Sequence, residues 1–536
     1  MWSSSLRFLF VLLTTQTTYG KEDVSYRPSN PTTTTDEPIS VLIIGAGASG
    51  LKAAQTLVDN GVEDFLILEA ANYIGGRVHD VEFGGIRVER GANWAQPVGG
   101  SVQKMVWKLG MKTHQSNWFS MVVYNSTGHN VTAEALPVWN QTVEKMYSAM
   151  SIADDLNALH DPDMSVRDGL RSVRWHPKTD IQQTIEWATL DFENGDAPEF
   201  ASLKSNALVK DEFNKRVPDD KKPTLIIDQR GYKYIFNATM PFLSDEKLRK
   251  NIILNKKVAT IDQSSGDVVV VTCDNGEIFK ASRVLVTVSC AILQNNGIEF
   301  IPDLPDWKIR TINRFRMASY SKIYLKFPIN FWGDREILLR PSNHRGRYPI
   351  FTNLEAKGLF PVGTNILMAE LTGAESLRVE ALADEAIKAE IETVLREIFG
   401  EDTPNATDIF VSGWSRNPLT LGAYSIWPPE MEQECFVKMQ SRVNNVFFAG
   451  EYTSEDNGFV QGALESGERE GIKIALCRNR SSCPHWPANQ SCFCGPLINL
   501  DYNTATMIAV KYKLLFISLL LLFTINVFDT IGLHIL

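Results

Sequence analysis

The chain has 536 residues, of which 44% are hydrophobic, and a formal net charge of -10 at pH 7. A chain of this length can bury large hydrophobic cores and is expected to form two or more packing units. The acidic balance argues against nucleic acid as a partner and suits a cationic ligand, although net charge describes no particular site.

Residues 1–20 predict a secretory signal peptide. They carry one arginine and an apolar core from Phe8 to Leu13, followed by small residues at plausible cleavage positions. A membrane anchor is the alternative. Residues 21–39 are rich in Ser, Thr and Pro and are predicted to be a disordered lead-in.

The segment from Val41 to Ala70 organises the rest of the chain. A short apolar strand, a glycine turn, a helix and a second apolar strand that ends on an acid are typical of a βαβ dinucleotide-binding unit. Gly45 permits the tight turn, Gly47 lets the backbone approach a pyrophosphate, and Gly50 lets the helix pack closely on the sheet. The helix N-terminus adds free N–H groups and a positive dipole end.

Glu69 closes this unit, nineteen residues after Gly50. A carboxylate there accepts hydrogen bonds from both ribose hydroxyls, so it favours FAD or NAD over NADP. Gly75 and Gly76 form a second glycine pair, and the following Arg77 could reach a diphosphate. A glycine turn in another α/β fold is the alternative, but strand, helix, acid and spacing all agree with a nucleotide site.

Two motifs carry a specific resemblance. The run LILEAANYIGGRV (Leu66 to Val78) and the run VERGANW (Val88 to Trp94) resemble the FAD-binding signature of the flavin amine oxidase family, and within it of the polyamine oxidases. The resemblance spans Val41 to Cys477. It implies an α/β fold with a discontinuous Rossmann-like FAD-binding domain and an α+β substrate-binding domain of the amine oxidase type.

Strand and helix signals divide the remaining chain between these two domains. Helical spacing dominates Gly99 to Asn214, whereas the Asn275-Gly276 hairpin turn and a buried-looking strand at Arg283 to Val288 indicate more of the nucleotide domain. A helix is predicted over Glu380 to Phe399. We assign residues 40–98, 224–306 and 440–477 to the FAD-binding domain and residues 99–223 and 307–439 to the substrate-binding domain.

Lys322 is the first candidate for catalysis. Alternation in the run MASYSKIYLKFP places Tyr320, Lys322 and Tyr324 on one face of a strand. The pattern alone equally fits a surface lysine whose stem lies along apolar neighbours. The resemblance implies a lysine that holds a water against the flavin, assists imine hydrolysis and activates dioxygen.

Tyr424 and Phe459 are candidates for the walls of a substrate channel. Their spacing alone is that of core aromatics. The resemblance implies two rings that flank the substrate before the flavin and attract its ammonium. Phe459 replaces a tyrosine that is frequent there, which removes a hydroxyl and keeps the aromatic pair.

Two polar residues complete the predicted channel. Glu193 resembles the channel carboxylate of plant-type polyamine oxidases, although a solvated loop with Asp191 and Asp196 also explains an acid there. Gln96 stands where the resemblance expects a glutamate or a histidine. Glutamine can hydrogen-bond a substrate nitrogen but cannot neutralise an ammonium, which argues against a classical preference for spermine or spermidine.

The resemblance also implies the residues that hold FAD. Glu451 would hydrogen-bond the ribityl or pyrophosphate region, unless it is an ordinary acid at a strand end, and Val258 would contact adenine through its backbone. No cysteine occupies the run GAYSIWP, where monoamine oxidases attach flavin covalently, so noncovalent FAD is expected. The predicted set is Gly45, Gly47, Gly50, Glu69, Ala70, Gly76, Arg77, Ala92, Asn93, Trp94, Val258, Gly450, Glu451 and Val460.

Sequons and cysteines support a secreted route. A Cys-rich tail at residues 478–503 follows Cys477, and in an oxidising compartment its cysteines predict a local disulfide staple. A zinc site fits less well, because only His485 lies nearby and the spacing matches no common pattern; no metal is predicted. The staple would use Cys477, Cys483, Cys492 and Cys494. The glycosylation sequons begin at Asn125, Asn130, Asn140, Asn237, Asn405, Asn479 and Asn489.

The C-terminal run from Leu514 to Phe528 is apolar but short for a membrane span. Lys511 and Lys513 precede it and nothing basic follows, which contradicts the positive-inside bias of a span. A GPI signal fits better: residues 504–536 would be removed after attachment near Asn503. A single-pass span is the alternative.

Together these features predict an FAD-dependent amine oxidase of the polyamine oxidase type, secreted or held at the cell surface. A hydride passes from a carbon beside the amine to flavin, water splits the imine into an aldehyde and a smaller amine, and dioxygen becomes hydrogen peroxide. Spermine, spermidine or acetylated derivatives are the expected substrates. The alternatives are an L-amino-acid oxidase, with Arg316 or Arg416 on the substrate carboxylate, and a catalytically silent flavin-binding surface protein, motivated by Gln96.

Overall fold

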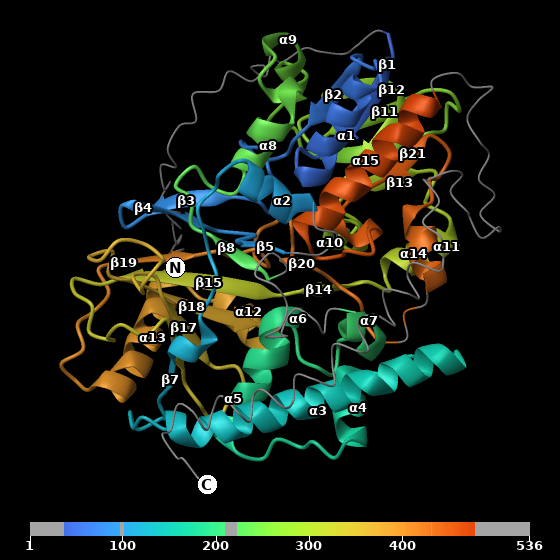
Figure 1. Ribbon diagram of the computed structural model, residues 1–536. Coiled ribbons are helices and arrows are strands. Elements are labelled where there is room, and N and C mark those ends of the chain that lie inside the picture. The colour runs from blue at the N-terminus through green and yellow to red at the C-terminus, as the bar shows by residue number, and fades with distance from the viewer. Residues whose placement is uncertain (1–36, 97–100, 209–221, 430, 432, 478–536) are drawn as a thin grey trace, which may run out of the picture.

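The computed structural model describes residues 37–96, 101–208, 222–429, 431 and 433–477. The expected signal peptide, most of the lead-in, the Cys-rich tail and the anchor signal fall outside these residues and stay predictions. In Figure 1 a sheet with its helices forms the upper part of the molecule, and a second sheet above a layer of helices forms the lower part.

The upper sheet has eight strands among the described residues. Five of them, β9, β2, β1, β12 and β21, pair in parallel, and β10 and β11 continue the sheet from β12 in antiparallel pairing, with β13 at the edge. This is the parallel core with an antiparallel ribbon that the sequence predicts. The strands are β1 (Ile39–Ile44), β2 (Phe65–Leu68), β9 (Ile252–Ile253), β10 (Val258–Asp262), β11 (Val269–Cys273), β12 (Ile278–Val286), β13 (Glu299–Ile301) and β21 (Val446–Phe448).

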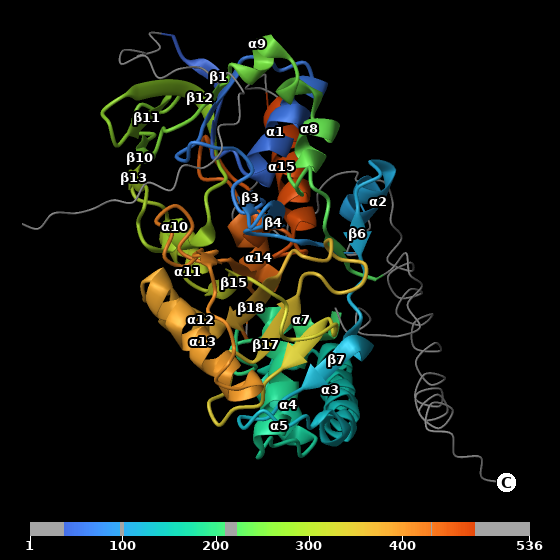
Figure 2. The same cartoon turned by 90° about the vertical axis from the view of Figure 1, so that its left-hand side faces the viewer.

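Alternate residues of β1 point into two separate cores, as expected of a strand that is covered on both faces. Ile43 lies in the core with helices α1 and α15, and Leu42 lies in the core on the other face. Figures 1 and 2 show α1 and α15 side by side. The helices here are α1 (Ala48–Asp59), α2 (Ser101–Lys108), α8 (Tyr234–Thr239), α9 (Glu246–Arg249), α10 (Cys290–Gln294), α11 (Asp306–Ile312), α14 (Gln433–Gln440) and α15 (Val460–Leu476).

The lower sheet has six strands in the described part of the chain, in the order β19, β15, β18, β17, β16 and β7. One face of β15 packs on helix α13 through Ile323 and Leu325. On the other face, Tyr324 packs against β3 and β4, so this face is turned toward the nucleotide part. The strands are β7 (Met121–Val123), β15 (Tyr320–Lys326), β16 (Ile337–Leu339), β17 (Ile350–Asn353), β18 (Ile366–Thr372) and β19 (Asp408–Val411).

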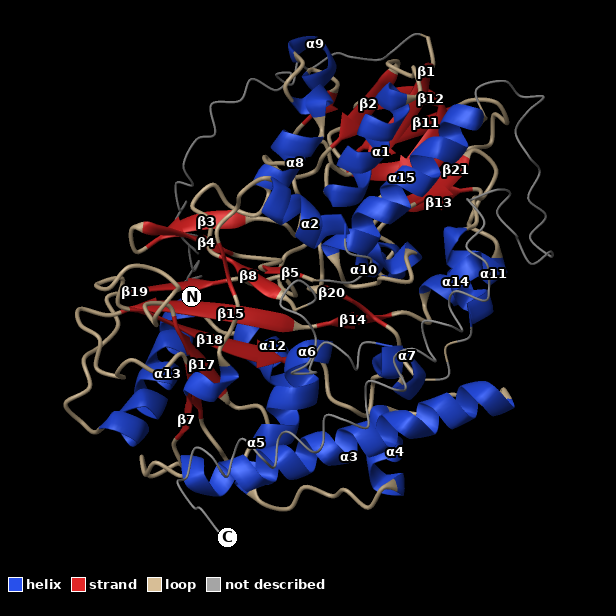
Figure 3. Cartoon of the chain, viewed as in Figure 1, coloured by secondary structure: helices blue, strands red, loops and turns tan. Residues whose placement is uncertain are grey.

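Helices cover the lower part of the molecule, and the long helix α3 runs along its lower edge (Figure 3). Residues 99–214 are mainly helical where the structure describes them, as predicted. The helices of the lower part are α3 (Thr132–Leu159), α4 (Val166–Ser172), α5 (Asp180–Glu186), α6 (Phe192–Asn194), α7 (Leu203–Leu208), α12 (Gly373–Glu380) and α13 (Asp384–Phe399).

Two of the three small sheets in the described part of the chain connect segments that are far apart in the sequence. One of them pairs β5, β8 and β6, which come from three different predicted domain segments, so the exact domain boundaries stay predictions. The strands are β3 (Asp80–Phe83) with β4 (Ile86–Glu89), β14 (Arg316–Ala318) with β20 (Tyr424–Ile426), and β5 (Trp94–Ala95) and β6 (Thr113–His114) on either side of β8 (Thr224–Ile226).

Two element boundaries differ from the sequence prediction. The helix predicted over Glu380 to Phe399 is α13 alone, and a short turn separates it from α12. Acids in the first turn of α13 favour a helix start there. The helical spacing of apolar residues continues across the turn between α12 and α13, however, so the sequence pattern does not reveal that turn. The strand predicted over Arg283 to Val288 starts earlier, as part of β12.

We expect Gly50→Ala to destabilise the fold. A Cβ at this position would lie 2.0 Å from the carbonyl oxygen of Gly45, and overpacking of this kind costs about 1–3 kcal/mol or more. The measurement is the free energy of unfolding of the flavin-free protein. Gly47→Ala is the matched control, because a Cβ there would meet no atom within 4 Å. Equal loss of stability in both variants would contradict this account.

Candidate active site

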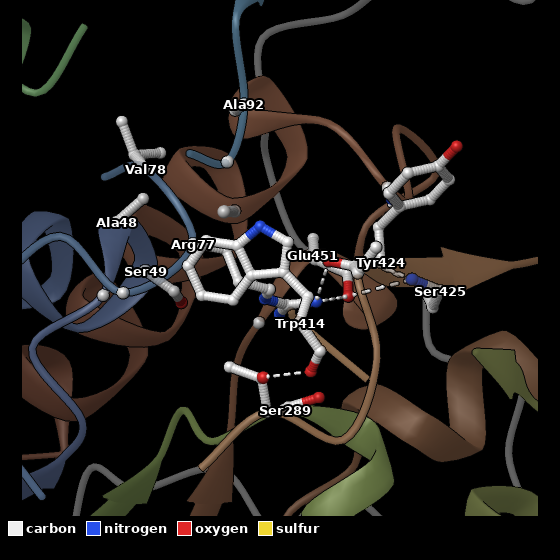
Figure 4. Close-up of a pocket in the computed structure, with 18 of the residues that line it drawn as sticks. Ala48, Ser49, Arg77, Val78, Ala92, Ser289, Trp414, Tyr424, Ser425 and Glu451 are labelled. Carbon is white, nitrogen blue, oxygen red and sulfur yellow. Dashed lines mark hydrogen bonds and ion pairs between the residues drawn. The ribbon is translucent and has the colours of Figure 1, made fainter. Parts of the chain in front are cut away.

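A cavity of about 1050 Å³ lies between the nucleotide part and the lower sheet, with walls from both. This volume exceeds the roughly 300–1000 Å³ of common small-molecule sites, and it has room for a dinucleotide together with a second ligand. Figure 4 shows part of its wall. Every site residue predicted from the sequence lines this cavity except Gly50, which packs on Gly45 instead.

The two glycine motifs pack backbone to backbone at one end of the cavity. The N–H of Gly75 donates to the carbonyl oxygen of Ala46 at 2.8 Å, and a Cβ at Gly76 would lie 3.2 Å from the Cα of Gly47. Gly45 has φ +106°, which favours glycine. Gly47 has an ordinary φ of -73° and open space beside it. The protein itself does not require glycine at Gly47, whereas a phosphate passing close to the backbone does.

Glu69 lies where the sequence predicts a ribose-binding acid. Its carboxylate accepts hydrogen bonds from the N–H groups of Ala46 and Ala71, each at 2.7 Å, and burial raises its pKa. The N–H of Lys256 donates to the carbonyl oxygen of Glu69 at 2.8 Å, which places the segment leading to Val258 beside it. Glu69, Ala70 and Val258 therefore share one end of the cavity, as an adenosine site needs.

Arg77 and Glu451 form an ion pair in the cavity wall, with Nη1 and Oε1 3.0 Å apart. Glu451 also accepts hydrogen bonds from the hydroxyl of Ser425 at 2.5 Å and from the N–H of Gly458 at 2.9 Å. Figure 4 shows this group around Arg77, Glu451 and Ser425. Arg77 also donates to the carbonyl oxygen of Ala423 at 3.1 Å. The arrangement presents a fixed cation to the cavity beside the glycine motifs.

The segment before Trp94 is held by the lower part of the molecule. Three consecutive carbonyl oxygens, from Glu89 to Gly91, accept side-chain hydrogen bonds. The hydroxyl of Tyr324 donates to the first at 2.8 Å, the indole N–H of Trp414 to the second at 3.0 Å, and the ammonium of Lys322 to the third. This contact fixes the predicted residues Ala92, Asn93 and Trp94 along the cavity.

Lys322 lies in the middle of β15 and is 6% exposed. Burial lowers its pKa to about 8, and the charges of Glu370 and Glu89 oppose this shift. Its burial excludes the alternative of a surface lysine. An ammonium carries three donors, of which the bond to Gly91 uses one. Lys322 therefore presents polar hydrogens to the cavity and has a pKa close to neutral pH.

Aromatic rings surround the same region. The rings of Tyr424 and Tyr320 have centroids 6.3 Å apart, and the Tyr424 hydroxyl donates to the carbonyl oxygen of Glu193 at 3.2 Å. Phe459 directly precedes α15, and the side chain of Asn457 ties its loop to the carbonyl oxygen of Ser425 at 2.9 Å. Tyr424 and Phe459 thus both line the cavity, and their role as walls of a substrate channel stays a prediction.

Glu193 and Gln96 are the predicted polar residues of the channel. Burial raises the pKa of Glu193 to about 7. The neighbouring Asp191 and Asp196 do not line the cavity, because they pair with Arg345 and Arg316. Glu193 is therefore the acid of this loop that faces the cavity. The side-chain oxygen of Gln96 is buried and has no hydrogen-bond partner among the described residues, which leaves it available to a ligand.

The sequence analysis missed Trp414 and the role of Tyr320 in this wall. Tyr320 lines the cavity and its hydroxyl donates to Glu370 at 3.1 Å; its position on the same strand face as Lys322 was the signal that could have identified it. Trp414 also stacks with Arg90, whose guanidinium carbon lies 4.4 Å from the ring centroid. No local pattern in the sequence marks Trp414.

The chain matches the family model described as flavin containing amine oxidoreductase over residues 48–471. The chain belongs to this family. Polyamine oxidase 1 of Zea mays is 34% identical over 473 residues, which cover 83% of this chain and 92% of that protein. Polyamine oxidase 7 of Oryza sativa subsp. japonica is 35% identical over 450 residues, covering 80% and 93%. A solved putrescine oxidase bound to putrescine has the same fold, with a TM-score of 0.65 and 20% identity over 82% of this chain and 99% of that one.

These similarities confirm the α/β fold of the flavin amine oxidases and the resemblance on which it was predicted. The protein is a flavin-dependent amine oxidase that acts on amines with dioxygen as electron acceptor. The residues that line the cavity fit a flavin nucleotide, because the open side of Gly47, the hydrogen-bonded carboxylate of Glu69 and the cation of Arg77 all belong to its wall.

We expect Lys322→Met to slow the oxidation of reduced flavin by dioxygen by about 100-fold, as loss of one preorganised electrostatic partner typically does. In the unchanged enzyme this rate should fall as the pH rises through about 8, because Lys322 loses its charge there. In the variant the rate should not change over this range. Stopped-flow absorbance measures the rate of flavin oxidation in the unchanged enzyme and in the variant.

Lys326→Met is the matched control. It removes a lysine from the same strand, but Lys326 does not line the cavity and its ammonium donates to the carbonyl oxygen of Thr364. An equal slowing in both variants, or a pH-dependent rate in Lys322→Met, would rule out the role assigned to Lys322.

Proposed function

We propose that this enzyme oxidises polyamines, which carry a second ammonium at a distance from the reacting nitrogen. The observation that carries the proposal is the position of Glu193, an acid that lines the cavity while its two acidic neighbours are paired elsewhere. The similarity of the chain to the polyamine oxidases of Zea mays and Oryza sativa also supports the proposal. Above pH 7 the Glu193 carboxylate is ionised, whereas aliphatic ammonium groups keep their charge.

The aromatic wall prepares the substrate for reaction. Tyr424 and Phe459 would hold the alkyl chain, exclude water from the reacting carbon and attract the ammonium through their ring faces. Bound flavin supplies the two-electron acceptor that the chemistry needs. Lys322, with a pKa of about 8, can hold a water at its ammonium and exchange a proton with it during imine hydrolysis.

Gln96 would contribute a neutral hydrogen bond. Its buried side-chain oxygen can accept from one N–H of the substrate, but it does not neutralise a charge. Of the predicted channel residues, Glu193 thus offers a carboxylate and Gln96 an amide, and Glu455 and Asp456 also line the cavity. These groups suit a substrate that carries an ammonium at a distance from the reacting nitrogen.

We further propose that the cofactor is noncovalent FAD. No cysteine or histidine of the described residues lines the cavity, which supports noncovalent binding. Glu69 would accept hydrogen bonds from the ribose hydroxyls, the Gly47 backbone and Arg77 would contact the diphosphate, and Glu451 would hold Arg77 in place.

The L-amino-acid oxidase alternative is disfavoured by the positions of its candidate arginines. Arg316 pairs with Asp196 at 2.5 Å, and Arg416 pairs with Asp384 at 2.8 Å. Neither arginine lines the cavity, so neither is placed to bind a substrate carboxylate there. The silent-protein alternative lacks support, because the chain belongs to an enzyme family and keeps Lys322 buried in the site.

The deciding experiment is a hydrogen peroxide assay of the purified flavoprotein. Spermine, spermidine, their acetylated forms, monoamines and free amino acids are each offered under air. We expect the highest kcat/KM for a polyamine. Turnover of amino acids alone would transfer the assignment to the L-amino-acid oxidases, and silence on every amine with flavin bound would end it.

Glu193→Gln should raise KM for spermidine about 10–100-fold, because it removes a charge-assisted hydrogen bond of about 1.5–3 kcal/mol. KM for a monoamine should stay unchanged, which makes the monoamine the matched control. In the unchanged enzyme, KM for spermidine should fall as the pH rises through about 7, because the Glu193 carboxyl loses its proton there. Steady-state kinetics from pH 6 to 8, roughly one unit on either side, test this, and equal KM changes for both substrates would refute it.

We propose that the enzyme is glycosylated, secreted and held at the cell surface by a GPI anchor. The sequon asparagines within the described residues, at 125, 130, 140, 237 and 405, are all exposed or half-buried, as glycosylation requires. No helix in the described residues is long and apolar enough to cross a membrane. The proposed disulfide staple would begin at Cys477, and its other cysteines lie outside the described residues.

Full-length protein expressed in a eukaryotic secretory host tests this. We expect a loss of mass on treatment with an N-glycosidase and release of the activity from intact cells by a phosphatidylinositol-specific phospholipase. Extraction by detergent alone would instead indicate a single-pass span. Activity free in the medium without phospholipase would exclude both kinds of anchor.

A further inference from the structure

We propose that Arg345 is a positioning residue for Glu193 and that it acts through a π-helical turn below the cavity. The inference rests on the proposed function, in which Glu193 binds the distal ammonium of the substrate. Arg345 does not line the cavity. It would therefore influence the affinity for long amines without touching them.

The π-helical turn, Trp187–Asp191, lies between α5 and α6. The N–H of Phe192 donates to the carbonyl oxygen of Trp187, five residues earlier, and all five residues of the turn are buried. Such wide turns are rare and occur frequently at functional sites. Glu193 follows directly, in the single turn of α6. Its direction is therefore set by the width of the π-helical turn.

Arg345 bridges this turn from one end to the other. Its Nη1 lies 2.8 Å from Oε1 of Glu186, the residue before the turn, and its Nη2 lies 2.5 Å from Oδ1 of Asp191, the last residue of the turn. Nε also donates to the second oxygen of Asp191 at 3.3 Å. Both acids are buried. One guanidinium thus fixes the distance between the two ends.

The carboxylate of Glu186, at one end of this bridge, is also bound by other side chains. Arg167 binds its carboxylate with two nitrogens, at 3.0 and 2.6 Å, and the indole N–H of Trp175 donates to it at 2.7 Å. Two bonded partners besides Arg345 therefore hold Glu186. In contrast, Arg345 donates to both carboxylate oxygens of Asp191, so the far end of the turn depends on this arginine.

The chain after Glu193 is also held. Gly195, with φ +73°, donates its N–H to the carbonyl oxygen of Asp191 at 2.8 Å and accepts from the N–H of Gly373 at 3.1 Å. The hydroxyl of Tyr424 holds the carbonyl oxygen of Glu193 at the cavity. The Glu193 backbone is thus fixed on the cavity side by Tyr424 and on the inner side through Asp191 by Arg345.

The consequence of losing the bridge follows from helix geometry. Without Arg345, two buried carboxylates remain close together and the turn can relax to an ordinary α-helix. That change shifts the hydrogen-bond register by one residue, and each residue of an α-helix turns the chain by about 100°. The Glu193 side chain would then leave its direction into the cavity, while the flavin end and Lys322 stay in place.

The test compares Arg345→Met and Arg345→Lys with the unchanged flavoprotein. For Arg345→Met we expect KM for spermidine to rise at least about 10-fold, with kcat and the monoamine KM changed by less than about 3-fold, as expected for loss of binding at a remote group. The fall of the spermidine KM near pH 7 should disappear. Arg345→Lys should restore part of the affinity, because lysine keeps the charge but not the fork of donors.

Arg378→Met is the matched control. Arg378 also joins two acids, Glu375 and Glu390, but it lies on α12 and does not line the cavity. We expect no change in KM for either substrate. If Arg345→Met fails to fold, Arg345→Met with Asp191→Asn removes the uncompensated charge, and the same kinetic changes are expected from this pair.

The outcomes separate the inference from the function on which it rests. If Glu193→Gln weakens spermidine binding but Arg345→Met does not, the positioning role is wrong and the polyamine assignment stands. If Glu193→Gln has no effect on spermidine, the assignment itself fails. If the Arg345 variants raise the monoamine KM equally or lose flavin, the arginine supports the fold in general, and the inference is also wrong.

Discussion

The buried carboxylate of Glu451 is the contact on which the geometry of the cavity depends. Its partners are Arg77 beside the glycine motifs, Ser425 on β20 and Gly458 in the loop before α15. One acid thus joins three segments that are far apart in the sequence. A buried charge is unfavourable unless it is paired and hydrogen-bonded, so any displacement of one segment leaves this acid unsatisfied. This penalty fixes the position of the nucleotide part relative to the wall that carries Tyr424.

Lys322 is also a buried charge that needs bonded partners, and its burial explains its chemistry. A lysine inside a buried strand is rare unless it is paired, and here the carbonyl oxygen of Gly91 and the charge of Glu370 compensate for part of the burial. The remaining effect lowers its pKa to about 8. Burial thus gives Lys322 a pKa at which its side chain can exchange a proton near neutral pH, as is common at active sites.

Gln96 and Glu193 contribute different polar groups to the cavity. Near the nucleotide part, Gln96 offers a neutral amide with an unused acceptor. Glu193 is an acid in the cavity wall, whereas the neighbouring Asp191 is bound by Arg345 and does not line the cavity. Glu193, Glu455 and Asp456 are acids in the cavity wall, so local carboxylates, and not the net charge of the chain, favour a cation there.

The sequence by itself determined the nucleotide unit and, through the family resemblance, predicted most of the residues discussed in the cavity wall. The Gly45 to Glu69 pattern is local, because each residue acts within one strand, turn and helix, and the alternation around Lys322 defines its strand face. Only the tertiary structure decided that Trp414 reaches the carbonyl oxygen of Arg90, that Asp191 turns away from the cavity, and that Arg345 spans the π-helical turn. These contacts join residues up to several hundred positions apart, and neither periodicity nor composition encodes which distant partner a buried polar group will find.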